Sequence, residues 1–254
     1  MAPAKPTILT FHGFGSNATV HTVQLARLSR LLRPTFEIVT LEAPFPSVAG
    51  PGVLPFFEGC GPYKRWSLPS EKLSIDSMKR GEASSVMPQE VESLIRNTVT
   101  EVFNEGGKVV GLIGFSQGTR VVAGLLKACE IRKEIGGEAE GWMDFGFALS
   151  VCGSYPPPLI PLSAVKLLSS ASLSDEEKKA LREGKIQIPT LHLQGKQDEW
   201  EWAGKLLIDG VYEAGEDKSK VLELEMGHHY PTLPEDTERV KDWIFDAWQR
   251  SQGR

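Results

Sequence analysis

Short hydrophobic runs alternate along this chain with segments of helical periodicity. The runs are rich in Val, Ile and Leu, and they cover residues 6–11, 36–41, 108–114, 145–151, 188–193 and 220–224. Apolar residues recur at helical spacing in residues 19–32, 90–103, 117–128 and 233–250. Strands without polar alternation are typical of a parallel sheet that is covered on both faces. The pattern therefore predicts an α/β fold, with a mainly parallel sheet of about six strands and helices on both faces.

Two segments interrupt this rhythm, residues 44–88 and 154–189. The first is rich in proline and also carries the aromatic residues Phe45, Phe56, Phe57, Tyr63 and Trp66. Long aperiodic stretches in compact domains are functional or disordered, and aromatic residues argue against disorder. We expect both segments to form a lid-like, substrate-binding layer over the carboxyl ends of the strands, with those five aromatic residues as candidate substrate-binding side chains; surface decoration is the alternative. No linker is visible, so one domain over residues 1–254 is expected.

The composition and charge argue against some classes of binding partner. The chain has 28 Lys and Arg against 33 Asp and Glu, a net charge of -5, and no basic block, which argues against nucleic acid. No stretch approaches the roughly 18 apolar residues that a membrane span needs, and residues 1–6 lack the apolar core of a signal peptide. The three cysteines lack metal or redox spacing, which favours reduced thiols. A cytoplasmic protein without a membrane partner is expected.

The clearest chemical motif is Gly114-Phe115-Ser116-Gln117-Gly118, which lies between a predicted strand and a predicted helix. This is the context in which a Gly-x-Ser-x-Gly sequence presents a nucleophilic serine on a sharp, strained turn. Small residues must flank the serine so that strand and helix can approach, which accounts for Gly114 and Gly118. Ser116 is therefore the candidate nucleophile, and a tight turn with an incidental serine is the alternative.

A serine hydroxyl needs a base within hydrogen-bond reach, and the chain offers five histidines. His192 lies within a strand and is expected in the core, His21 is expected at an exposed helix start, and His12 is expected to shape a loop. The pair His228 and His229 follows the last strand and so opens on the edge where the serine lies. Adjacent histidines without a third ligand nearby are poor zinc candidates, so no metal site is expected.

The base in turn needs a carboxylate that fixes its tautomer. Asp198 follows the fifth predicted strand and lies between the serine and the histidine pair in sequence. The order Ser, Asp, His is typical of α/β-hydrolases. Glu199, Glu201 and Asp209 are the competing carboxylates, although the two glutamates are more simply explained as solvated charges.

Acyl transfer also needs donors for an oxyanion. The backbone N–H of Gln117, which follows the serine, is one candidate. The loop after the first strand, residues 12–14, is expected to supply the second, and the N–H of Phe14 is the candidate there.

These motifs together resemble the fungal serine hydrolase (FSH) family of α/β-hydrolases. The resemblance rests on HGFGSN, EAPFPS, GFSQG, GKQDE and GHHYP, which occur in this order between Phe11 and Pro231. Within the family, the chain is most similar to thioesterases of fungal polyketide pathways, such as that of the lovastatin pathway. By position, the resemblance implies Ser116 as nucleophile, Asp198 as acid and His228 as base. The family's Gly-Gly-His is Met226-Gly227-His228 here, so His229 remains an alternative base.

The resemblance implies hydrolysis of carboxylic esters or thioesters without a cofactor. The expected substrate is a polyketide or fatty acyl thioester, and the leaving group would be the thiol of an acyl-carrier domain or of coenzyme A. A general carboxylesterase that acts on small esters is the first alternative. A hydrolase-fold protein that binds a ligand with little turnover is the second.

Overall fold

The centre of the molecule is a six-stranded sheet in which every neighbouring pair of strands is parallel. The computed structural model describes residues 4–136 and 142–252. The strand order is β2-β1-β5-β6-β7-β8. The strands are β1 (Thr7–Phe11), β2 (Glu37–Leu41), β5 (Val109–Phe115), β6 (Phe147–Val151), β7 (Thr190–Gly195) and β8 (Ser219–Leu224). The order reverses between β1 and β5, so the carboxyl ends of these two strands form the switch point where open α/β sheets bind ligands.

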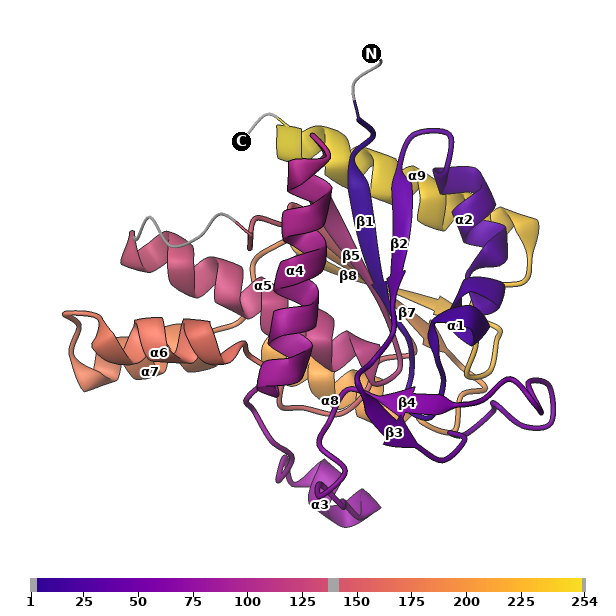
Figure 1. Cartoon of the computed structure of the whole chain (residues 1–254), viewed down its shortest axis with the longest axis horizontal. Helices are drawn as coiled ribbons and strands as arrows, with labels where there is room; N and C mark the ends of the chain where they lie inside the picture. Colours follow the sequence, from indigo (N-terminus) through magenta and orange to yellow (C-terminus); the bar gives the residue numbers. More distant parts are fainter. Residues whose placement is uncertain (1–3, 137–141, 253–254) are drawn as a thin grey trace.

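Helices cover both faces of the sheet (Figure 1). One hydrophobic core lies under α1 (Ala18–Gln24), α2 (Ala26–Leu32) and α9 (Pro234–Gln252). The other lies under α4 (Gln89–Asn104), α5 (Gly118–Ile135) and α8 (Glu201–Val211). The predicted α/β fold is therefore confirmed, with strands at the expected places. Within the described part of the chain, no helix has the length and apolar character needed to cross a membrane.

Several helices differ from the sequence pattern. The single helix predicted over residues 19–32 is two helices, since Leu25 ends α1 and caps α2. Helices α6 (Leu162–Ser170) and α8 were not anticipated. Both are short, and α6 starts directly after Pro161 within a segment that looked aperiodic. Helix α7 (Asp175–Glu183) lies in the same segment and begins with a capping box of Ser174 and Glu177.

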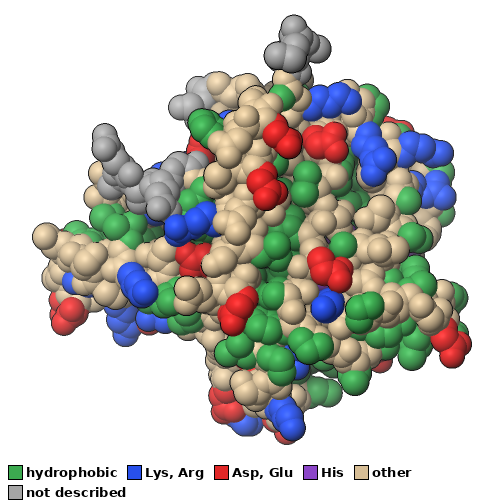
Figure 2. Space-filling model, viewed as in Figure 1, with side chains coloured by type: hydrophobic (Ala, Val, Ile, Leu, Met, Phe, Trp, Pro, Cys, Tyr) green, Lys and Arg blue, Asp and Glu red, His purple; other side chains and the backbone are tan. Residues whose placement is uncertain are grey.

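The segment of residues 44–88 lies at the carboxyl ends of the strands, as expected (Figure 1). It contains the hairpin of β3 (Phe45–Ser47) and β4 (Tyr63–Arg65) and the short α3 (Ile75–Lys79). The N–H of Gly15, in the loop after β1, donates to the carbonyl of Lys64 over 2.9 Å, which ties the hairpin to the sheet. Figure 2 shows hydrophobic side chains gathered over β3, β4 and α3.

Three histidines are buried within the fold. His12, expected in a loop, lies 2.7 Å through Nδ1 from the Gly13 carbonyl and accepts from the N–H of Ala43 through Nε2. His192 is in the core as expected, with its ring 4.4 Å from that of Tyr212. The expectation that His21 is exposed was wrong, because it is fully buried. Burial lowers the pKa of His12 to about 4, and those of His21 and His192 to about 3.

We expect these histidines to make the fold acid-sensitive. The unfolded chain binds protons near pH 6.5, whereas the native histidines stay neutral until far lower pH, so stability falls as the pH drops below 6.5. Each histidine contributes about 1.4 kcal/mol per pH unit in that window. His192→Phe keeps a ring against Tyr212 and removes one titrating group. Its free energy of unfolding should therefore fall by about 2 kcal/mol less between pH 6.5 and 4.5 than that of the wild type. Urea denaturation at several pH values measures this difference, and parallel curves for the two proteins would contradict it.

Candidate active site

Ser116 lies on a strained turn between β5 and α5. Its φ of 50° is in the left-handed region, which an L-residue outside glycine rarely adopts. The N–H of Ser116 donates to the carbonyl of Val151 over 3.0 Å, which holds the turn against the end of β6. The strand–turn–helix context predicted for the serine motif is present.

The two glycines of the motif are required by close backbone contacts. A Cβ on Gly114 would lie 2.8 Å from the carbonyl oxygen of Gly118. A Cβ on Gly118 would overlap the carbonyl oxygen of Phe11, so only glycine lets α5 start against the end of β1. The loop after β1 consequently passes beside the serine, and a Cβ on Gly13 would lie 3.2 Å from that of Ser116.

His228 and Asp198 form a hydrogen-bonded pair beside Ser116. The loops after β8 and β7 bring them together, and Nδ1 of His228 donates to Oδ2 of Asp198 over 2.8 Å. The other carboxylate oxygen accepts from the N–H of Trp200 over 2.8 Å. Burial raises the pKa of Asp198. The hydrogen bond from His228, the charge of that ring and the hydrogen bond from the Trp200 N–H lower it more, so the pKa lies below its usual value. The carboxylate is therefore ionised and sets the Nδ1–H tautomer of the ring.

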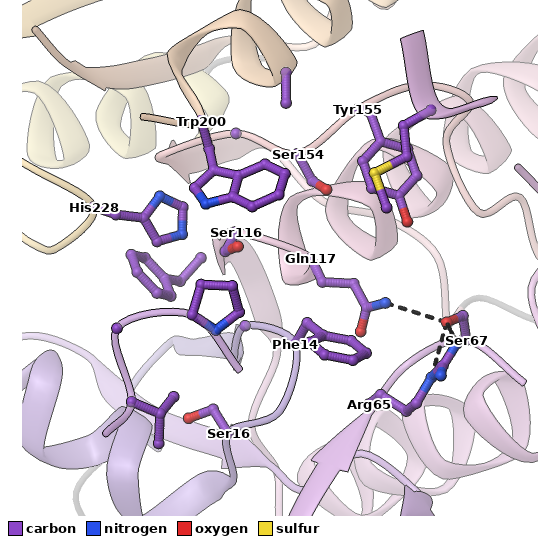
Figure 3. Close-up of a pocket in the computed structure, with 18 of the residues that line it drawn as sticks. Phe14, Ser16, Arg65, Ser67, Ser116, Gln117, Ser154, Tyr155, Trp200 and His228 are labelled. Carbon is purple, nitrogen blue, oxygen red and sulfur yellow. Dashed lines mark hydrogen bonds between the residues drawn. The ribbon is translucent and has the colours of Figure 1, made fainter. Parts of the chain in front are cut away.

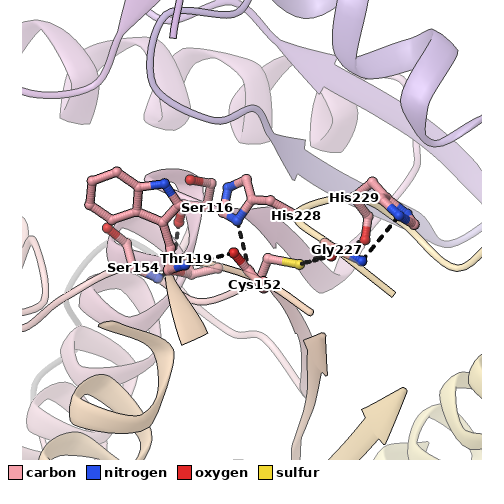
Figure 4. Close-up of polar contacts among 9 residues, drawn as sticks. Ser116, Thr119, Cys152, Ser154, Gly227, His228 and His229 are labelled. Carbon is pink, nitrogen blue, oxygen red and sulfur yellow. Dashed lines mark hydrogen bonds and ion pairs between the residues drawn. The ribbon is translucent and has the colours of Figure 1, made fainter. Parts of the chain in front are cut away.

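Among the rival residues, the geometry separates His228 from His229. His229 is exposed, and its Nδ1 lies 2.8 Å from the carbonyl of Tyr230, while its Nε2 accepts from the N–H of Gly227 (Figure 4). Glu199 is exposed, and Glu201 forms an ion pair with Lys205 at 2.8 Å. Asp209 lies within α8. Only Asp198, of the described carboxylates, is within ion-pair distance of His228.

Cys152 packs against the loop that carries His228, a role that the sequence did not reveal. It follows β6, is 1% exposed, and has a φ of 47°, a second strained backbone position near Ser116. Its Sγ lies 3.7 Å from the carbonyl of Gly227 and 3.6 Å from that of His229, so it packs under the histidine loop (Figure 4). Burial, followed by the charge of Asp198, raises the pKa of the thiol.

Cys152, Asp198 and His228 are also the one described cluster that could bind a metal ion, with ligand atoms within 4.8 Å of one another. A zinc site usually takes four ligands, with each cysteine as thiolate. Here the raised pKa keeps the thiol protonated, and the carboxylate is already hydrogen-bonded to the imidazole. The cluster therefore fits a hydrogen-bonded catalytic pair better than a metal centre.

The candidate oxyanion donors belong to residues that line the cavity at the serine. Phe14 and Gln117 line the same cavity as Ser116. Within the described chain, the N–H groups of these two residues form no backbone hydrogen bonds outside the helices and strands. The N–H groups of Phe14 and Gln117 therefore remain the candidate donors for an oxyanion at Ser116.

Trp66 anchors this arrangement rather than lining the cavity. Its side chain is fully buried and its Nε1–H donates to the carbonyl of His12 over 2.8 Å. Its backbone N–H donates to the side-chain oxygen of Gln117 over 2.9 Å. The residue therefore fixes the segment of residues 44–88 onto both loops that flank Ser116.

The other four aromatic residues expected to bind substrate also lie outside the cavity. Phe45 packs against the core, and the Tyr63 hydroxyl donates to the carbonyl of Phe57 over 2.6 Å, within the segment itself. Phe56 is 85% exposed. Phe45 and Trp66 are instead used to attach the segment to the main fold, by packing and by hydrogen bonds, whereas Phe56 faces solvent.

A cavity of about 410 Å³ opens at Ser116 and is mainly apolar (Figure 3). Its walls include Phe115, Trp200 and His228 from the main fold and Val53, Leu73 and Met78 from residues 44–88. The segment of residues 154–189, expected to line the cavity too, contributes only Ser154 and Tyr155. The rest of it forms α6 and α7, which extend away from the sheet (Figure 1).

Thr119 connects the serine turn to the beginning of this second segment. Its hydroxyl donates to the carbonyl of Ser116 over 2.7 Å and accepts from the buried N–H of Ser154 over 2.9 Å (Figure 4). One hydroxyl thus satisfies two backbone groups at the cavity wall.

The family model described as serine hydrolase (FSH1) matches residues 1–240 of the chain. The chain belongs to this FSH1 serine hydrolase family. The expected resemblance is thereby confirmed, and the protein is a serine hydrolase of α/β-hydrolase fold.

Similar sequences come from Aspergillus and Gibberella species. The chain is 31% identical to the dihydromonacolin L (lovastatin nonaketide synthase) thioesterase of Aspergillus terreus, over 94% of this chain and 91% of that protein. It is 27% identical to the thioesterase FSL2 of Gibberella zeae, over 97% and 94%. It is 28% identical to the esterase FUS5 of Gibberella moniliformis, over 98% and 89%.

Solved structures share the fold of this hydrolase at low sequence identity. SOBER1 of Arabidopsis thaliana aligns with a TM-score of 0.50 and 17% identity, over 96% of this chain and 99% of that one. TT1662 of Thermus thermophilus aligns with a TM-score of 0.50 and 18% identity, over 97% and 90%.

We expect Thr119→Val to destabilise this serine hydrolase by about 1–3 kcal/mol, because the buried Ser154 N–H loses its acceptor. Thr119→Ser, the matched control, keeps the hydroxyl and should lose less than half as much. Chemical denaturation of the two variants measures the difference. Equal free energies of unfolding for Thr119→Val and Thr119→Ser would show that the hydroxyl does not stabilise the fold through the Ser154 N–H.

Proposed function

We propose that this serine hydrolase is a thioesterase that releases a polyketide or fatty acyl chain through an acyl-serine intermediate. The observation that supports this most directly is that strained Ser116 shares one cavity with His228, which is hydrogen-bonded to buried Asp198. Such an arrangement is the requirement for activating a serine hydroxyl at neutral pH.

In the proposed mechanism, Oγ of Ser116 attacks the acyl carbonyl while Nε2 of His228 takes its proton. Asp198 stabilises the imidazolium and keeps its orientation. The oxyanion accepts hydrogen bonds from the N–H groups of Phe14 and Gln117. The intermediate collapses with cleavage of the carbon–sulfur bond, and His228 returns its proton to the leaving thiolate. Water, deprotonated by His228, then attacks the acyl-serine and releases the acid.

The relatives and the cavity support a bulky acyl thioester as substrate. Two relatives are named thioesterases, one of them for a polyketide synthase. The mainly apolar cavity beside Ser116 suits an acyl chain, since ligand sites are concave and largely hydrophobic with a few polar groups. We propose that the leaving group is the thiol of an acyl-carrier domain or of coenzyme A, and that the protein acts in the cytoplasm.

A general carboxylesterase is the second candidate, because another relative is named an esterase. The same catalytic residues would serve both reactions. The hydrogen-bonded pair at a strained serine argues against a ligand-binding protein with little turnover, since such a protein gains nothing from that strain.

We expect Ser116→Ala and His228→Ala each to lower kcat for acyl thioesters by roughly 10³-fold or more. His229→Ala is the matched control, because this exposed neighbour points away from the cavity, and its kcat should change by less than about twofold. Steady-state hydrolysis assays measure these effects, and circular dichroism checks that each variant is folded. Loss of activity in His229→Ala with retention in His228→Ala would reverse the assignment of the base.

The choice between thioesterase and carboxylesterase is tested by matched substrates. For acyl chains of equal length, we expect kcat/KM for the thioester to exceed that for the oxygen ester by more than about tenfold, which corresponds to ~1.4 kcal/mol in the barrier. The comparison is corrected for the uncatalysed hydrolysis of each substrate. A preference for short oxygen esters would favour the carboxylesterase instead.

A further inference from the structure

A guanidinium group forms one end of the apolar cavity. Arg65, at the end of β4, lines the cavity on the side opposite His228, with Ser116 and Gln117 between them (Figure 3). A cation in a mainly apolar cavity is costly to desolvate unless it has a purpose or a partner.

Arg65 is held rigidly in place. Its Nη2 donates to Oγ of Ser67 over 2.7 Å and to the carbonyl of Glu71 over 2.8 Å, and its Nε donates to Ser67 over 3.2 Å. The guanidinium carbon lies 5.3 Å from the centre of the Phe14 ring. Nε2 of Gln117 donates to the same Ser67 oxygen over 3.2 Å, so Arg65 is connected to the residue that follows the nucleophile.

This end of the cavity is short of negative charge. No carboxylate of a described residue lies within ion-pair distance of Arg65. Glu71 is the one acidic residue among the described cavity walls, and its Oε1 accepts from the N–H of Ser84. Nη1 of Arg65 has no protein partner in the described chain and is not sealed from solvent. Behind the wall, buried Arg120 lies 4.7 Å from the ring of Tyr155 and adds a second positive charge.

The position of Arg65 determines which half of the substrate it can reach. In the proposed function, on which this inference rests, His228 must protonate the leaving thiol, so the leaving group lies on its side of Ser116. The acyl chain then extends the opposite way, towards Arg65.

We propose that Arg65 is a specificity-determining residue that binds an oxygen function on the acyl chain. The preferred acyl groups then carry a carboxylate or a ketone rather than a plain alkyl end. A rigid guanidinium with free N–H groups matches such oxygens, whereas an alkyl chain leaves the cation desolvated and without a partner. Sites built to hydrogen-bond a substrate group reject analogues that lack it more strongly than apolar pockets reject a missing methylene.

The test uses N-acetylcysteamine thioesters whose acyl chains end in a methyl group, a methyl ketone or a carboxylate, at hexanoyl, octanoyl and decanoyl lengths. At the best length, we expect the wild type to have a higher kcat/KM for an oxygenated chain than for the alkyl chain. Arg65→Gln should lower this ratio by about tenfold or more. Arg65→Lys, which keeps the charge but loses the planar fork, should fall in between.

Arg80→Gln is the matched control, since it removes the same charge from an exposed arginine of the same segment that lies outside the cavity and pairs with Glu82. For Arg80→Gln, the ratio of kcat/KM for the oxygenated chain to kcat/KM for the alkyl chain should equal that of the wild type. An equal fall of all three substrates in Arg65→Gln, at unchanged stability, would overturn the proposal. The same acyl chains are also tested as coenzyme A thioesters. A loss in Arg65→Gln that is confined to these would overturn the proposal too, because it would place a leaving-group phosphate on Arg65.

The outcome for Arg65 is separable from the outcome for the proposed function. Absence of any hydrolysis that depends on Ser116 would refute the thioesterase function itself. Hydrolysis that depends on Ser116, with a ratio that Arg65→Gln leaves unchanged, would refute only the inference about Arg65.

Discussion

The whole site depends on one close backbone contact, between the first turn of α5 and the end of β1. Gly118 allows it, because any Cβ there would overlap the carbonyl of Phe11. The contact forces Ser116 into a left-handed conformation and brings the loop of Gly13 against its side chain. The strain at the serine is maintained by the sheet, whose parallel strands hold both loops at the same edge. The candidate nucleophile and the candidate oxyanion donors are thus positioned by the packing of the scaffold rather than by flexible side chains.

A second constraint is the burial of one carboxylate. The Asp198 side chain is 1% exposed, yet it stays charged because His228 and the Trp200 N–H both donate to it. Cys152 fills the space beneath the histidine loop without adding charge, since its thiol is protonated. In such a low-dielectric setting the fixed Asp198 carboxylate interacts strongly with the neighbouring His228 imidazole. The loop after β8 can therefore be irregular and still hold the His228 ring at the wall of the cavity that Ser116 also lines.

The cavity combines an apolar interior with polar side chains that are held from behind. Trp66 attaches residues 44–88 to the loop after β1 and to Gln117, and Ser67 then connects Gln117 with Arg65. The wall that is proposed to meet the acyl chain is consequently joined to the serine turn through short hydrogen bonds. In this arrangement, specificity and chemistry share the same rigid support.

The sequence by itself determined the strands, their parallel arrangement and the strained serine turn, because these follow from local hydrophobic patterns and from glycine spacing. It also narrowed the acid to Asp198 and a few neighbours through chain order. Only the tertiary structure decided between His228 and His229, because side-chain direction in an irregular loop has no periodic signal. It likewise decided that His21 is buried and that Trp66 anchors the site. The place of Arg65 in the cavity wall could not be predicted for a similar reason, because the side chains of a long aperiodic segment that face the cavity depend on contacts between residues far apart in the chain.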